Sequence, residues 1–256
     1  MQASRAFSDI SVNCRSTLSV GISRLRGSLF FQKIWDCYHK THPNISIQLI
    51  DGNTTKFDEM LQAGKIDLFI GINVFEEPDQ IRIELAREKT QCFMTHELLL
   101  QYHPQDYQEI LDNFKRGADP AAIIDMPFIG LCRGNRMRDT LDLFAQARRL
   151  KPNFILECDQ QRVIYSLARE GAGVGFVSPV VLYQQLEDIQ SNGKNYHIFP
   201  VTDDFPDTKV HLVYRGDSPI PKYMEDFIQS SVAVFRGYSR TVLENLVYSN
   251  YQEYQQ

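Results

Sequence analysis

Five arginines stand in two short stretches of the sequence and could bind an anion. They are Arg24, Arg26, Arg133, Arg136 and Arg138. A guanidinium presents several N–H donors in one plane and holds a carboxylate or a phosphate through paired hydrogen bonds. If the fold sets the two stretches facing each other, a small anionic ligand is the expected partner. The alternative is that these arginines are solvated surface residues.

Other motifs predict neither a cofactor nor catalysis. Gly171, Gly173 and Gly175 resemble a dinucleotide fingerprint, but that motif must follow a strand and open a helix, whereas here a helix precedes it and a strand follows. His39 and His42 lie three residues apart with no evident third metal ligand. We find no Ser/His/Asp set, nucleophile elbow or phosphate-binding loop. We therefore expect no cofactor, no metal and no enzymatic activity.

The first part of the chain alternates strands and helices. Residues 17–23 and 45–49 alternate apolar with polar side chains, as half-buried strands do, and the apolar run 66–72 predicts a strand covered on both faces. A polar loop at 24–28 is expected after the first strand. The helix that follows has an expected apolar face of Phe30, Ile34, Cys37 and Tyr38. The order β-α-β-α-β predicts parallel strands.

A similar order returns later in the chain. Residues 127–131, 153–157 and 174–177 predict strands, and a polar loop at 132–135 precedes a helix. The predicted inward face of that helix is Met137, Leu141, Phe144 and Arg148. Two α/β halves, joined by strands that cross between them, are the simplest interpretation.

Helix starts and the end of the chain carry further signals. Thr55 with Asp58 predicts a capping box, and Asp159 is placed to cap a later helix. A strand at 209–214 and an amphipathic helix over 224–235 come last.

Composition limits the class of protein. The 256 residues carry a net charge of -5, which argues against a surface that grips nucleic acid. No apolar run is long enough to cross a bilayer, and the N-terminus has no signal peptide, so we expect a cytoplasmic protein without membrane contact. The five cysteines are scattered and odd in number, which suits reduced thiols. They are Cys14, Cys37, Cys92, Cys132 and Cys158.

Four segments, in this order and spacing, resemble the effector-binding domain of LysR-type transcriptional regulators. They are Leu18–Ser23, His42–Ile47, Leu61–Ile70 and Arg169–Pro179. The resemblance covers roughly residues 17–237. It implies a periplasmic-binding-protein-like type II α/β fold, in which two α/β subdomains are joined by crossover strands and a ligand cleft lies between them.

The same resemblance implies a division of the chain. Subdomain I is expected at 17–90 and 205–237, subdomain II at 91–204, a remnant of a linker helix at 1–16 and a polar tail at 238–256. Members of the family begin with a winged helix-turn-helix, and from the resemblance we expect that domain to be absent from these 256 residues. The stretch 91–126 is longer than the family usually has, and its helices are not assigned.

The expected effector site lies at the carboxyl ends of parallel strands, beside helix starts. This rule selects the loops that follow four predicted strands, and LysR-type effector domains use the matching loops together with the stretch around Gly173 to Phe176. The resemblance therefore implies effector contact at Ser23, Thr54, Arg133 and Phe176. The full set of candidates is Ser23, Arg24, Asn53, Thr54, Cys132, Arg133, Gly134, Asp159, Gly173 and Phe176. Ser23 and Thr54 could instead be helix caps, and Phe176 could be a core residue.

The resemblance therefore predicts the sensing and oligomerisation part of a bacterial regulator. Its partners would be a small, anionic effector and copies of itself in a homodimer or tetramer, with DNA bound only through the absent N-terminal domain. Effector binding would shift the population of subdomain angles. The helix from Phe30 to Tyr38 is expected to pack on the Leu141 to Phe144 helix of a second copy. A solute-binding protein of a transport system, or an enzyme on the same fold, are the alternatives.

Overall fold

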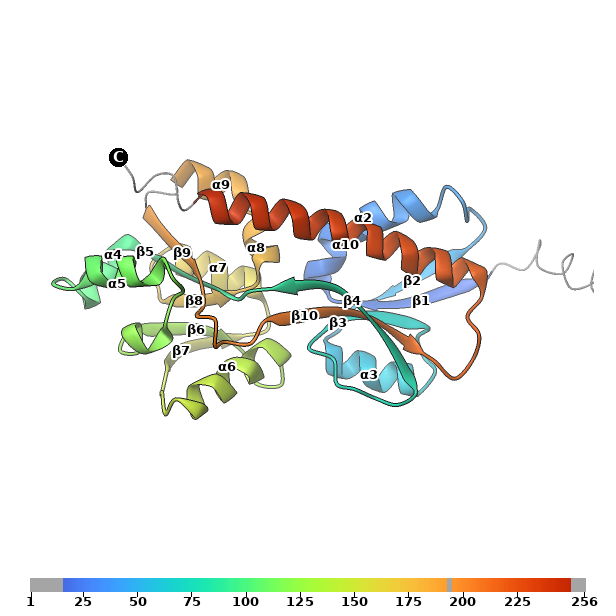
Figure 1. The fold of residues 1–256 in the computed structure, drawn as a ribbon, viewed down its shortest axis with the longest axis horizontal. Helices are drawn as coiled ribbons and strands as arrows, with labels where there is room; N and C mark the ends of the chain where they lie inside the picture. The colour runs from blue at the N-terminus through green and yellow to red at the C-terminus, as the bar shows by residue number, and fades with distance from the viewer. Residues whose placement is uncertain (1–15, 193–194, 250–256) are drawn as a thin grey trace, which may run out of the picture. The chain divides into compact units, whose positions relative to one another are not determined.

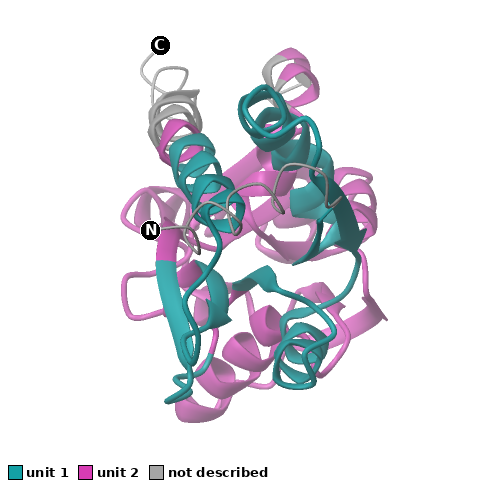
Figure 2. Cartoon of the chain, turned by 90° about the vertical axis from the view of Figure 1, so that its right-hand side faces the viewer, with its two compact units in different colours: residues 1–71, 75–83, 211–235 teal, residues 72–74, 84–210, 236–256 magenta. Residues whose placement is uncertain are grey.

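The computed structural model describes residues 16–192 and 195–249. The chain forms two compact units (Figure 2): unit 1 comprises residues 1–71, 75–83 and 211–235, and unit 2 comprises 72–74, 84–210 and 236–256. The boundaries between the units fall at the end of the strand Leu68–Ile72, inside the strands β4 (Gln80–Glu88) and β10 (Thr208–Arg215), and inside the helix Lys222–Ser249. The subdomain boundaries expected from the sequence stay a prediction, and the linker remnant at 1–16 lies almost wholly outside the described residues.

The first sheet has the strand order β2-β1-β3-β10-β4 (Figure 1). Its first three strands are β1 (Thr17–Ile22), β2 (Ser46–Ile50) and β3 (Leu68–Ile72). β1 pairs in parallel with both β2 and β3, with Thr17 opposite Ser46 and Val20 opposite Leu68. The predicted parallel β-α-β-α-β unit is thus confirmed, and the carboxyl ends of β1 and β2 are neighbours.

Helix α2 (Arg24–Tyr38) starts earlier than the sequence predicts. The loop expected at 24–28 is wrong, because these residues already form the first turn and the amide of Gly27 donates to the carbonyl of Ser23 at 2.7 Å. The buried face comprises Arg26, Phe30, Ile34 and Tyr38, whereas Cys37 is exposed. A period of four residues from Arg26 explains this face, because residues i and i+4 lie on one side of a helix.

Two predicted caps are also wrong. Helix α3 (Thr54–Gln62) is capped by Asn53, whose side-chain oxygen accepts from the amide of Lys56 at 2.9 Å, and not by Thr55 with Asp58. Helix α7 (Gln161–Arg169) has Gln160 at the N-cap position, with no side-chain cap bond, in place of Asp159. In each case a neighbouring polar residue lies at the point where the backbone turns into the helix.

The second sheet has the strand order β7-β6-β8-β5-β9. Its strands are β5 (Gln91–Thr95), β6 (Pro127–Leu131), β7 (Asn153–Cys158), β8 (Val174–Val177) and β9 (Tyr196–Pro200). β6 is parallel to β7 and β8, as predicted, and β5 is antiparallel to β8 and β9. Unit 2, which contains this sheet, also has the helices α6 (Arg136–Ala147), α8 (Pro179–Tyr183) and α9 (Leu186–Asn192).

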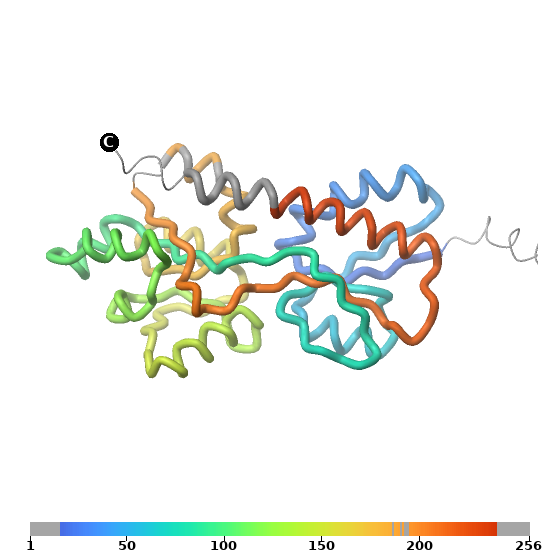
Figure 3. The backbone as a smooth tube through the Cα atoms, viewed as in Figure 1, coloured from blue at the N-terminus to red at the C-terminus, as the bar shows by residue number. Residues whose placement is uncertain are grey.

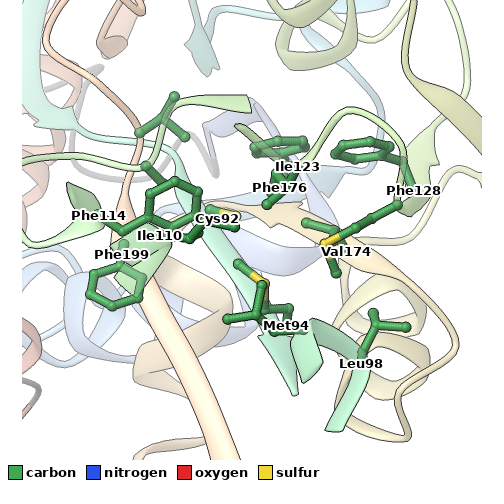
Figure 4. Close-up of a cluster of buried hydrophobic side chains, with 14 of the residues drawn as sticks. Cys92, Met94, Leu98, Ile110, Phe114, Ile123, Phe128, Val174, Phe176 and Phe199 are labelled. Atoms are coloured by element: carbon green, nitrogen blue, oxygen red, sulfur yellow. The ribbon is translucent and has the colours of Figure 1, made fainter. Parts of the chain in front are cut away.

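The stretch left unassigned at 91–126 contains β5 and three helical segments, which Figure 3 follows from β5 to β6. These segments are α4 (His96–Tyr102), α5 (Tyr107–Phe114) and the 3₁₀ turn η1 (Pro120–Ile123). Their apolar side chains join the core of unit 2, where Phe114 meets Phe199 edge to face at 5.7 Å (Figure 4). The added segment therefore enlarges the core of this unit and is not a solvated loop.

Helix α10 (Lys222–Ser249) ends the described chain and continues past Gly237. The expected polar tail from 238 is therefore helical up to Ser249, and the remainder of that tail lies outside the described residues. The ring of Tyr238 packs edge to face on Tyr183 of α8 at 5.9 Å and is largely buried. This aromatic contact explains why the helix does not stop at the glycine.

Candidate functional site

In unit 1, the loops after β1 and β2 are tied together by Asp51. Its carboxylate accepts from the backbone amide of Arg24 at 2.8 Å and from the Arg24 guanidinium at 2.7 Å. The ammonium of Lys56 donates to the Asp51 carbonyl at 3.1 Å. The carboxylate of Asp51 thus lies at the start of α2, where the helix dipole favours negative charge. It also balances the positive charge of Arg24.

The three polar candidates of unit 1 have different roles. Asn53 caps α3, so its side-chain oxygen is already used. Ser23 lies at the N-cap position of α2, but within the described part of the chain its hydroxyl makes no cap bond. Thr54, in the first turn of α3, is buried. The alternative that both residues are helix caps holds for Ser23 only in its position and is wrong for Thr54, which lies inside α3. Contact of either residue with an effector stays a prediction.

In unit 2, the loop after β6 presents Arg133. Gly134 has a φ of +85°, in the left-handed region, and its amide donates to the Asp139 carboxylate at 3.2 Å. Asn135 caps α6 by accepting from the amide of Met137 at 3.0 Å. Arg133 is exposed and forms no hydrogen bond or ion pair with the described residues. The loop is therefore fixed by its own bonds while its arginine points to solvent.

Arg138 is a structural residue and not part of an exposed arginine cluster. Only 3% of its side chain is exposed, and its guanidinium pairs with Asp142 and Glu157. It also donates to the carbonyl of Leu131 at 2.7 Å and lies 3.9 Å from the ring centre of Phe154. Burial lowers the pKa of this guanidinium, but the hydrogen bonds to both carboxylates outweigh burial and raise it.

Arg26 is buried on the inner face of α2, and Arg136 is partly buried at the start of α6. Arg26 and Arg138 therefore lie buried on helices and not in loops, so both the hypothesis of an anion-binding loop cluster and the alternative of solvated surface residues are wrong for these two. Arg24 is paired with Asp51, which leaves Arg133 as the strongest candidate for an anion.

Cys132 and Asp159 follow adjacent strands and meet. The amide of Cys132 donates to the carbonyl of Cys158 at 3.1 Å, which extends the pairing of β6 with β7. Burial raises the pKa of the Cys132 thiol, and a hydrogen bond with the Asp159 carboxylate raises it further. The thiol is thus protonated and suited to donating a hydrogen bond, and not to nucleophilic chemistry.

Phe176 and Gly173 lie in the interior of unit 2. The ring of Phe176 stacks on Phe128 at 5.7 Å and is 5% exposed (Figure 4). A Cβ added to Gly173 would lie 2.9 Å from the carbonyl oxygen of Pro127, so close packing explains the glycine. Contact of either residue with an effector stays a prediction.

Sequence reasoning missed the two acidic residues that shape these loops, Asp51 and Asp139. One signal was present, because each is an acidic residue close to a predicted strand end or helix start, where the helix dipole favours an anion.

Among the described residues, no group of three or more His, Cys, Asp or Glu side chains could hold a metal ion. Within the same part of the chain, no helix is both long and apolar enough to span a membrane.

Two sheets with parallel strands, each with polar loops at the strands' carboxyl ends, define an α/β ligand-binding domain of the periplasmic-binding-protein-like class. This confirms the predicted fold class. The family model for the LysR substrate binding domain matches residues 14–236, and the chain belongs to this family. The predicted resemblance is therefore confirmed.

Relatives and solved structures agree with this family. The chain is 24% identical over 190 residues to the probable RuBisCO transcriptional regulator of Trieres chinensis, which covers 73% of this chain and 59% of the relative. An HTH-type regulator of Bacillus subtilis is matched over only 50% of its length, so the chain spans between half and three fifths of these curated relatives.

Two solved effector-binding domains share the fold. That of QuiR in complex with shikimate has a TM-score of 0.68 at 14% identity, covering 88% of this chain and 99% of QuiR's. That of BenM with its effector benzoate has a TM-score of 0.66 at 20% identity, covering 88% of this chain and 95% of BenM's.

Proposed function

We propose that this chain senses a small carboxylate-bearing metabolite on behalf of a LysR-type transcriptional regulator and has no catalytic role. The observation that carries the proposal is Arg133, an exposed guanidinium without an internal partner among the described residues, at the carboxyl end of β6. The other arginines of the hypothesis are paired or lie on buried or partly buried helix faces. Shikimate and benzoate, bound by two solved relatives, are both carboxylates, which supports the same ligand class.

Further residues of the proposed site in unit 2 are those whose polar groups border Arg133. We propose Cys132 and the Gly134 backbone as uncharged contacts. Asp159 disfavours a ligand with several negative charges, because like charges repel at short range. The proposed effector therefore has a single carboxylate and hydrogen-bonding groups elsewhere.

Replacing Arg133 by alanine is expected to weaken binding of a small carboxylate about 10- to 100-fold, because a charge-assisted hydrogen bond contributes roughly 1.5–3 kcal/mol. Arg133→Lys should retain part of the affinity, since an ammonium keeps the charge but loses the planar pair of donors. The measurement is isothermal titration of the 256-residue chain with a panel of monocarboxylates that includes benzoate and shikimate.

The matched control ligand is benzamide, which has the shape of benzoate without its charge. Binding that is equally strong for acid and amide, or unchanged in Arg133→Ala, would overturn the carboxylate assignment. The thermal unfolding of the variant should match that of the original chain, because Arg133 has no internal partner among the described residues to lose.

We further propose that the chain functions in the cytoplasm as a homodimer, alone or within a tetramer, and reaches DNA only through another part of the regulator. The faces first expected to meet a second copy are used elsewhere: Phe30, Ile34 and Tyr38 are buried in unit 1, and Leu141 and Phe144 in unit 2. Leu143 on the outer side of α6 is 67% exposed, and Ile155 on the edge strand β7 is 54% exposed. These outward side chains are the better candidates for contact with a second copy.

Replacing Leu143 by glutamate is expected to convert the proposed dimer into a monomer, because a charge placed in an apolar interface must be desolvated without a partner. Sedimentation equilibrium at micromolar concentration measures the mass. Tyr102→Glu is the matched control, since Tyr102 is an exposed apolar side chain on another helix, α4. A dimer that survives Leu143→Glu, or dissociates equally in both variants, would contradict this interface.

A further inference from the structure

Asn73 adopts a backbone conformation that side chains rarely take. Its φ is +45°, and in the described part of the chain only Arg149 shares a positive φ among residues other than glycine. Asparagine tolerates this left-handed region better than most residues do, but glycine would adopt it with less strain. Asn73 follows directly on β3. Because glycine would adopt this backbone conformation with less strain, we expect the asparagine side chain to make interactions that offset the strain.

The first use of this side chain is to pair with β10. The Asn73 amide donates to the carbonyl of Lys209 at 2.8 Å, and the Asn73 side-chain oxygen accepts from the amide of Lys209 at 2.9 Å. The side-chain oxygen replaces the backbone carbonyl that a regular strand residue would offer. Asn73 thus satisfies both backbone polar groups of Lys209.

The second use is a contact with α6. The Asn73 side-chain nitrogen donates to the Thr140 hydroxyl oxygen, at 3.4 Å, and the same hydroxyl lies 2.9 Å from the carbonyl of Arg136. A hydroxyl has one proton, and a carbonyl can only accept, so Thr140 donates to Arg136 and accepts from Asn73. One directed series of hydrogen bonds therefore runs from Lys209 through Asn73 and Thr140 to Arg136.

The first turn of α6 is in turn bonded to the loop that contains Arg133. The carboxylate of Asp139 accepts from the amide of Gly134 at 3.2 Å, and the amide of Asp139 donates to the carbonyl of Asn135 at 2.9 Å. A displacement of this loop must therefore displace the first turn of α6. All residues of the series belong to unit 2.

We propose that Asn73 is a positioning residue that couples the Arg133 loop and the first turn of α6 to strand β10, the strand that continues into unit 1 after Val210. Its regulatory meaning rests on the proposed function, because the loop is the candidate effector site. The coupling itself requires no effector. Binding at Arg133 would be transmitted to β10 because the side-chain amide of Asn73 holds both elements at once.

The test is amide hydrogen exchange of the effector-free 256-residue chain, measured by NMR at Lys209 and Asp139. Thr140→Val removes the hydroxyl without changing the shape of the side chain. It should accelerate exchange of the Lys209 amide about three- to tenfold, although Thr140 is bonded to Asn73 and not to Lys209, because the loosened Asn73 oxygen is the acceptor of that amide. Thr140→Ser, which restores the hydroxyl, should restore the original rate.

Asn73→Gly provides the second route, since glycine keeps the positive φ and loses both side-chain bonds. It should accelerate exchange at Asp139 as well as at Lys209, and adding Thr140→Val to it should change the Lys209 rate no further. A Lys209 rate that is unaffected by Thr140→Val, or effects of the two substitutions that simply multiply, would overturn the coupling. Because no ligand is present, that failure would leave the carboxylate assignment of Arg133 intact.

Discussion

Replacing Arg138 by alanine is expected to lower the free energy of unfolding by about 3 kcal/mol. Removing one member of a buried ion pair costs about 3–5 kcal/mol when the partners remain buried. Here Asp142 and Glu157 are 39% and 42% exposed, so water can solvate them after the change and the lower end of that range applies. The Leu131 carbonyl also loses its guanidinium donor, and the ring of Phe154 loses the group that covers it.

Urea unfolding followed by circular dichroism measures this loss. Arg133→Ala is the matched control, because it makes the same chemical change on an exposed side chain in the loop before α6 and should alter the unfolding free energy by less than about 0.5 kcal/mol. Arg138→Lys should fall between the two, since an ammonium keeps one ion pair but cannot reach all three acceptors. A loss below about 1 kcal/mol for Arg138→Ala would mean that this ion network contributes little to stability.

The strands could be predicted from the sequence because burial leaves a direct mark on them. β1 alternates buried and less buried residues along Leu18, Ser19 and Val20, and the continuous apolar run of β3 belongs to a strand covered on both faces. Once strands and helices alternate, parallel pairing follows, and with it the edge of the sheet where loops gather. The predicted location of the candidate loops therefore depended on topology alone.

Helix starts could not be predicted to the residue, because several polar residues compete for each cap. Asn53, Thr54 and Thr55 all have side chains that can cap α3, and the backbone turn at Asn53 decides among them. At α2 the first turn contains a buried arginine, Arg26, which a hydrophobic pattern does not recognise. The segment 91–126 was not assigned because its helices have only seven and eight residues, too few for a clear period.

The arginines show the same limit at the candidate site. Residue type indicates what Arg133 and Arg138 can bind, but not which of them has an internal partner. Arg133 lies in the loop before α6, and Arg138 lies five residues later in the first turn of that helix. The ion-pair partner of Arg138, Glu157, belongs to a strand and lies 19 residues further along the chain. Such a long-range contact depends on the pairing of β6 with β7, which a single sequence leaves open in its details.

Acidification from pH 7 to pH 5 is expected to destabilise the chain by about 2 kcal/mol through His197. Burial, together with the smaller effect of nearby His96, lowers the pKa of this side chain to about 4. The two rings share a hydrogen bond of 2.9 Å, and the ring of Tyr107 packs against His96. In the unfolded chain the histidine has a pKa of about 6.5, so between pH 6.5 and 4 the unfolded state binds one more proton than the folded state does.

The free energy of unfolding therefore rises with pH through this window. The contribution of neutral His197 is fully present above about pH 6.5, and about 3 kcal/mol of it is lost in total as the pH approaches 4. The carboxylates with lowered pKa, which are Asp112, Asp204 and Asp226, act at lower pH, because their contribution is lost only as the pH falls below their ordinary value of 3.8. Urea unfolding of His197→Gln, which cannot titrate, isolates the effect. Its unfolding free energy should change by less than about 0.5 kcal/mol between pH 7 and pH 5. An equal loss in both proteins would place the acid sensitivity elsewhere and would mean that His197 accepts a proton without breaking its bond to His96.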